Sequence, residues 1–138
     1  MILQHIALWT RQLERMREFY ETYFDGIPGE KYFSEKEFNA PFTSYFLEFD
    51  QGAQLELMQM NSIPAGDSAA GNQTLGLTHI AFSVDTPEEV DALVEKLKKA
   101  GHQMVGEPRR TGDDYYEAVV LDPDGNRVEI VVPPKRDN

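Results

Sequence analysis

Apolar and polar residues along the chain follow one pattern that occurs twice. Residues 1–9 are apolar and β-prone, which predicts a strand. Residues 11–26 carry apolar side chains at helical spacing and end at a glycine, which predicts a helix. Three further strands are predicted at residues 30–39, 43–50 and 53–60. The first half is therefore predicted to be a β-α-β-β-β unit.

The same order returns in the second half. Residues 77–85 predict a strand, and a helix follows from Pro87, where a first turn tolerates proline, to Gly101. The remaining strands are predicted near 103–105, at 115–122 and at 126–132, the last two around a DPDG turn. Residues 61–76 are rich in Gly, Ser, Ala and Pro without any period, which predicts a linker.

The length of 138 residues is that of one domain. We predict a single domain, 1–138, in which module one spans 1–60, the linker 61–76 and module two 77–134. One such unit leaves a sheet face uncovered, so two units are expected to pair and bury a common core.

Composition narrows the function classes. The net charge of −11 argues against nucleic acid as a partner, because a phosphate backbone would be repelled. No apolar run approaches the roughly 18 residues needed to span a bilayer, and no signal peptide is visible, so we expect a cytoplasmic protein without a membrane partner. The absence of cysteine excludes disulfides, thiolate metal ligands and a cysteine nucleophile.

Two histidines and two glutamates recur at matching places. "LQHIALWTR" contains His5 and "LTHIAFSVD" contains His79, while Glu56 and Glu129 lie mid-strand between apolar neighbours. A half-buried carboxylate is costly unless it is paired or coordinated. Two imidazoles and two carboxylates facing one centre would hold a divalent cation and leave two positions of an octahedral ion for water or substrate oxygens. Nitrogen and oxygen donors suit Ni²⁺, Zn²⁺ or Co²⁺, with Fe²⁺ or Mn²⁺ as alternatives.

The paired modules resemble the vicinal-oxygen-chelate superfamily in four stretches, "HIALW", "LELMQ", "THIAFSVD" and "LDPDGNRVEIV". This superfamily includes glyoxalase I, fosfomycin-resistance proteins, extradiol dioxygenases and bleomycin-binding proteins. The resemblance implies an α+β fold in which two tandem β-α-β-β-β modules form a curved mixed sheet around a shared cavity. It also implies a homodimer and a small-molecule substrate. Bacterial glyoxalase I uses His, Glu, His, Glu as metal ligands, an order that matches His5, Glu56, His79 and Glu129.

The resemblance therefore implies a metal-dependent lyase or isomerase that acts on the hemithioacetal of a 2-oxoaldehyde and a thiol. Glu129 is expected to take the proton from the carbon bearing sulfur and return it to the neighbouring carbon, and Glu56 is able to do the same on the opposite face. Two alternatives stay open. One is another metalloenzyme of the superfamily, an extradiol-type dioxygenase or a fosfomycin-type thiol transferase. The other is a drug-binding resistance protein without chemistry.

Substrate contacts are predicted at Trp9, Met58 and Tyr116 as pocket lining, and at Arg109 with its neighbour Arg110 for an anionic group. The alternative interpretation is that both arginines are solvated loop charges. The chain carries Trp9 where bacterial glyoxalase I tends to carry a glutathione-binding arginine, and Met60 where it tends to carry asparagine. The nearby residues of the same types are Arg11 and Asn61, and they are the predicted replacements for these contacts. A thiol other than glutathione is therefore an open alternative.

Overall fold

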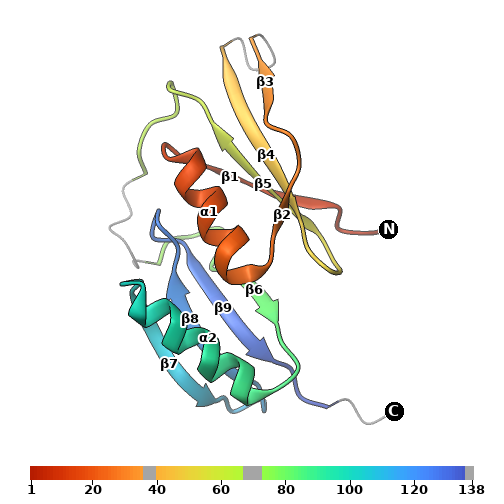
Figure 1. Cartoon of the computed structure of the whole chain (residues 1–138), viewed down its shortest axis with the longest axis vertical. Coiled ribbons are helices and arrows are strands. Elements are labelled where there is room, and N and C mark those ends of the chain that lie inside the picture. The colour runs from red at the N-terminus through yellow and green to blue at the C-terminus, as the bar shows by residue number, and fades with distance from the viewer. Residues whose placement is uncertain (36–39, 67–72, 136–138) are drawn as a thin grey trace. The chain divides into compact units, whose positions relative to one another are not determined.

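The computed structural model describes residues 1–35, 40–66 and 73–135. The chain divides into two compact units, Met1–Gly66 and Asp67–Asn138. Each unit consists of one mixed sheet and one helix, as Figure 1 shows. Within the described residues, neither helix has the length and apolar character that crossing a membrane requires.

The first unit is a sheet in the order β1-β5-β4-β2, with β3 paired to β4 and helix α1 packed against β4 and β5. Its elements are β1 (His5–Trp9), α1 (Leu13–Phe24), β2 (Ile27–Pro28), β3 (Tyr32–Ser34), β4 (Phe42–Glu48) and β5 (Gln54–Gln59). Strand β1 runs parallel to β5, and the other pairings are antiparallel. The buried side of α1 includes Met16, Phe19 and Tyr20, which bury large apolar surfaces and stabilise this unit.

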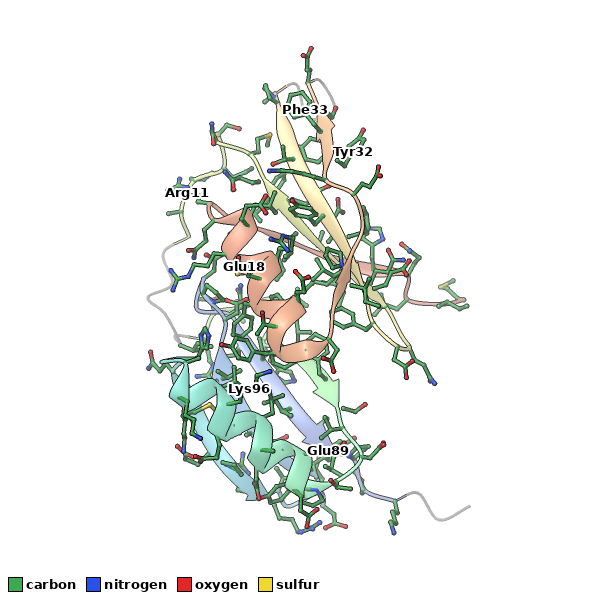
Figure 2. All side chains as sticks on the ribbon, viewed as in Figure 1. Arg11, Glu18, Tyr32, Phe33, Glu89 and Lys96 are labelled. Carbon is green, nitrogen blue, oxygen red and sulfur yellow. The ribbon has the colours of Figure 1, made fainter. Side chains whose placement is uncertain are left out.

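The second unit repeats this plan in the order β6-β9-β8-β7, with helix α2 packed against β7, β8 and β9. Its elements are β6 (Ile80–Ser83), α2 (Pro87–Lys99), β7 (Met104–Arg110), β8 (Tyr116–Leu121) and β9 (Arg127–Val132). A capping box fixes the beginning of α2, because the Thr86 side chain accepts the Glu89 backbone N–H and the Glu89 carboxylate accepts the Thr86 backbone N–H. Figure 2 shows Glu89 and Lys96 on this helix.

The predicted α+β class and the repeated β-α-β-β-β order are confirmed, with differences at element ends. Strand β2 was not predicted, because two residues are too short for a periodic signal. The strand expected at 30–39 is limited to Tyr32–Ser34 among the described residues, and 36–39 lie outside them. Strand β7 extends to Arg110, well beyond the expected 103–105. Strand β6 begins at Ile80, so His79 lies immediately before it.

Candidate functional site

Each unit brings one histidine next to one glutamate through the same strand register. In the first unit Ala7 of β1 lies opposite Glu56 of β5, and His5 stands two residues before Ala7 on the same face. In the second unit Ala81 of β6 lies opposite Glu129 of β9, and His79 stands two residues before Ala81. The repeat in sequence is therefore also a repeat in pairing.

The two His–Glu pairs have the spacing of neighbouring metal ligands. The His5 Nε2–Glu56 Oε1 distance is 3.7 Å, and the His79 Nε2–Glu129 Oε2 distance is 3.3 Å. For metal–ligand bonds of about 2.1 Å, adjacent ligand atoms lie about 3.0 Å apart in an octahedral site and about 3.4 Å apart in a tetrahedral one. The His79–Glu129 distance lies within this range and the His5–Glu56 distance is slightly longer, so each pair is able to supply two ligands to a divalent ion after at most a small side-chain shift. Their nitrogen and oxygen donors suit Ni²⁺, Zn²⁺ or Co²⁺.

Each pair taken alone is an incomplete site. Among the described residues, no group of three or more His, Asp or Glu side chains is arranged to hold a metal ion. Two protein ligands are fewer than the three or four that catalytic zinc and related sites use. Each unit therefore carries half of the predicted ligand set, His5 with Glu56 and His79 with Glu129.

The histidine in the first unit is held by its neighbours. The His5 ring packs edge-on against Phe46 at 5.3 Å between centroids, and Phe46 lies directly opposite Glu56 on β4. The His5 Nδ1 atom pairs with Gln4 Oε1, which leaves Nε2 facing Glu56. A metal-binding histidine characteristically uses its second ring nitrogen for such a hydrogen bond. Only 12% of the Glu56 side chain is exposed, so its charge is largely removed from water.

The carboxylate in the second unit lies among charged residues. Burial raises the pKa of the Glu129 carboxyl above its usual value. The charges of His79 and Arg109 lower this pKa, and the charge of Glu117 raises it further. Glu117 is on β8, two residues from Val119, which lies opposite Glu129, so all three side chains share a sheet face. A desolvated carboxylate with a raised pKa is a stronger base than an exposed one, which suits proton transfer.

Sequence reasoning missed Glu117. Glu117 lies two residues before Val119, the residue opposite Glu129, and therefore shares the sheet face of Glu129. Counting in steps of two along β8 would have found it, but only once the pairing of β8 with β9 was known. Its side chain is 16% exposed, and its Oε1 accepts from Arg109 Nη2 at 3.4 Å. The structure therefore places the predicted Arg109 beside this carboxylate, on the same face as Glu129.

Two predicted pocket residues lie on the face of the first sheet that carries His5 and Glu56. Trp9 stands at the end of β1, 39% exposed, opposite Met58 on β5. Met58 itself is 7% exposed and belongs to an apolar cluster with Phe42 and Met60. Trp9 is therefore the more exposed of the two side chains, whereas Met58 is packed in this apolar cluster.

Arg11 and Asn61 each lie two residues after a strand, β1 and β5 respectively. The Arg11 guanidinium donates to the Ile63 carbonyl oxygen at 2.9 Å, which ties the segment after β5 to the beginning of α1 (Figure 2). Asn61 is exposed in the turn that follows β5. Arg11 thus has a structural contact with the segment after β5.

Tyr116 lies on the opposite face of the second sheet from Glu129. Its hydroxyl donates to Asp91 Oδ1 of α2 at 2.8 Å, and this hydrogen bond to a carboxylate raises the pKa of the Tyr116 phenol. The reason is strand parity: Tyr116 and Glu117 are adjacent, so they point to opposite faces. Tyr116, predicted as pocket lining, therefore lies on the sheet face opposite to that of Glu129.

Comparison with known proteins places these observations in a family context. The model of the Glyoxalase/Bleomycin resistance protein/Dioxygenase superfamily matches residues 2–130. The uncharacterized protein YqjT of Bacillus subtilis (strain 168) is 36% identical over 62 residues, which are 43% of this chain and 48% of that protein. The alignment thus spans about half the length of this curated relative.

Solved structures share the fold. The crystal structure of SMU.1112c superimposes with a TM-score of 0.75 at 22% identity, over 96% of this chain and 98% of that one. A trypanothione-dependent glyoxalase I of Leishmania major gives a TM-score of 0.74 at 21% identity, over 95% of this chain and 86% of that one. At these identities the similarity establishes the fold, and the chemistry has to be argued from the site.

Proposed function

Because the chain belongs to the Glyoxalase/Bleomycin resistance protein/Dioxygenase superfamily, we propose that it is a metal-dependent lyase of the glyoxalase I type. Its substrate is the hemithioacetal of a 2-oxoaldehyde and a thiol. The observation that carries this proposal is the pair of matched His–Glu couples, at 3.7 Å and 3.3 Å, set in the same register in both units.

We propose His5, Glu56, His79 and Glu129 as the ligands of one divalent ion, Ni²⁺, Zn²⁺ or Co²⁺. The four residues come from one chain, or the two pairs come from different chains of a homodimer. When bound, the ion would act as a Lewis acid that polarises the two substrate oxygens. The four-ligand set favours this assignment over the dioxygenases and thiol transferases of the superfamily, which use two histidines and one glutamate.

The chain's own residues would perform the proton transfer. Glu129 takes the proton from the carbon that bears sulfur and delivers it to the neighbouring carbon, which converts the hemithioacetal into a 2-hydroxy thioester. The raised pKa of Glu129 supports this role, because a buried carboxylate is a better base. Glu56, which is also buried, is the candidate for the same transfer on the other side of the substrate. His5 and His79 would hold the ion.

The remaining features of the protein agree with a small-molecule enzyme. The net charge of −11 disfavours nucleic acid, and we propose a cytoplasmic homodimer. Trp9, the only tryptophan of the chain, stands on the sheet face of His5 and Glu56 and is proposed to line the substrate pocket. Asn61, exposed after β5, and Arg11, which donates to the Ile63 carbonyl oxygen, are proposed as further substrate contacts.

The test is thioester formation from methylglyoxal and a panel of thiols, measured by absorbance after the full chain is loaded with Ni²⁺, Co²⁺ or Zn²⁺. We expect Glu129→Gln to lower kcat by at least about 100-fold, because the variant loses its base and a ligand. Glu18→Gln, an exposed isosteric change on α1 (Figure 2), serves as the control and should keep wild-type activity. Metal binding with oxygen uptake on Fe²⁺ loading, and no thioester, would move the assignment to a dioxygenase.

A further inference from the structure

Strand β7 carries two adjacent arginines that the structure separates. Arg109 lies opposite Glu117 of β8, on the face of the second sheet that carries Glu129. Arg110 lies opposite Tyr116, on the face that α2 covers, and its Nη1 donates to Asp114 Oδ1 at 2.8 Å. Both arginine side chains are about equally exposed, at 61% and 59%. Only one of the two therefore belongs to the candidate site.

Glu117 differs from an ordinary surface partner of an arginine. Its side chain is 16% exposed, whereas the acidic partner of Arg110 is 68% exposed. An ionised carboxylate in such a place is stable only when a cation or hydrogen-bond donors satisfy it. Arg109 Nη2 at 3.4 Å from Glu117 Oε1 provides that partner. This contact holds one end of the Arg109 guanidinium at the Glu117 carboxylate and leaves most of the guanidinium exposed.

The open part of Arg109 has binding capacity left. A guanidinium carries five N–H donors in a planar fork, and one contact with Glu117 uses a fraction of them. Such a fork binds a carboxylate through two parallel hydrogen bonds. Because the side chain is already anchored, less rotational freedom is lost when a ligand binds.

We propose that Glu117 is a positioning residue that sets Arg109 to bind a carboxylate on the thiol portion of the substrate. This inference rests on the proposed function, and it names the substrate class: hemithioacetals of thiols that carry a carboxylate. Glu117 itself touches neither the ion nor the reacting carbons. Its contribution is to substrate affinity and to the choice between charged and neutral thiols.

The experiment compares hemithioacetals formed from 3-mercaptopropionate and from its neutral amide, 3-mercaptopropionamide. We expect the wild type to prefer the anionic substrate by about tenfold in kcat/KM, as for one charge-assisted contact. Glu117→Gln should raise KM for the anionic substrate several-fold and leave both KM for the neutral substrate and the metal content unchanged. Any change in kcat should be equal for the two substrates, because the lost Glu117 charge acts on Glu129 whichever substrate is bound. Arg109→Gln should abolish the preference. Arg110→Gln is the matched control and should retain it.

Two outcomes overturn the inference: a Glu117→Gln variant with wild-type preference, or one in which KM rises equally for both substrates. Binding is measured beside turnover with the inert thioethers 3-(methylthio)propionate and 3-(methylthio)propionamide, titrated by NMR. If the wild type binds the charged thioether more tightly, Glu117→Gln weakens that binding, and no isomerisation occurs, the proposed function fails and the positioning role stands. If the wild type isomerises without any charge preference, the positioning role fails and the proposed function stands.

Discussion

Replacing Asp122 by alanine should lower the free energy of unfolding of the second unit. Asp122 is 4% exposed at the turn between β8 and β9. Its Oδ1 accepts the backbone N–H groups of Asp124 and Asn126, and its Oδ2 accepts the Asn126 side-chain amide, each at 2.9 Å. The carboxylate therefore organises the whole DPDG turn.

The size of the loss follows from these three hydrogen bonds. A hydrogen bond to a charged group contributes roughly 1.5–3 kcal/mol, and contributions within one network are less than additive. Water can reach the freed N–H groups of a surface turn, which reduces the cost further. We expect a loss of about 3 kcal/mol for Asp122→Ala. Asp122→Asn keeps one oxygen acceptor and should lose about half of that amount.

Urea unfolding of the full chain, followed by circular dichroism, measures this effect. Asp50→Ala is the matched control, because Asp50 is an exposed turn residue in the first unit, where a substitution should change the free energy of unfolding by less than about 0.5 kcal/mol. An Asp122→Ala midpoint indistinguishable from that of Asp50→Ala would refute the reasoning. It would mean that backbone pairing alone fixes the turn.

Three further predictions concern the beginning of α2, the segment after α1 and the face of the second sheet that α2 covers. Thr86→Ala should cost about 1 kcal/mol of unfolding free energy, measured in urea, because the capping hydrogen bond to the Glu89 N–H is lost. Gly26→Ala should cost about 1–3 kcal/mol, since an added Cβ would lie 2.9 Å from a leucine side chain; a thermal midpoint equal to wild type would contradict this. Tyr116→Phe should leave metal content and thioester formation unchanged, because its hydroxyl binds Asp91 away from Glu129; a several-fold loss of turnover would show otherwise.

The order of elements was predictable because the periods of apolar residues are strong. The residues of α1 alternate between buried and exposed with helical spacing, and its buried set includes Leu13, Met16 and Phe19. The short strand β2 was not predictable, since Ile27–Pro28 is held by pairing with β4 rather than by its own pattern. Strand β7 contains Gly106 and Pro108 and has irregular pairing, which hid its full length.

The candidate site was predictable in part. The His-Ile-Ala repeat and the spacing of the glutamates identified the residues that form the two couples, because a matching position in both units requires the same register. The local pattern did not fix the face of Tyr116, and Glu117 beside it was overlooked, because the choice between the two faces depends on which residue of β8 lies opposite Glu129. Pairing across strands is a long-range property that the local pattern leaves open.

The metal content of the purified full chain tests the central claim most directly. After loading with Ni²⁺, Co²⁺ or Zn²⁺ and dialysis, elemental analysis should find about one ion per chain, since one site uses two His–Glu couples. Glu56→Gln and Glu129→Gln, each in a different unit, should each weaken binding at least about 100-fold, and Glu107→Gln, an exposed control, should not. No retained ion would contradict the account, and so would two ions per chain, each held by one couple.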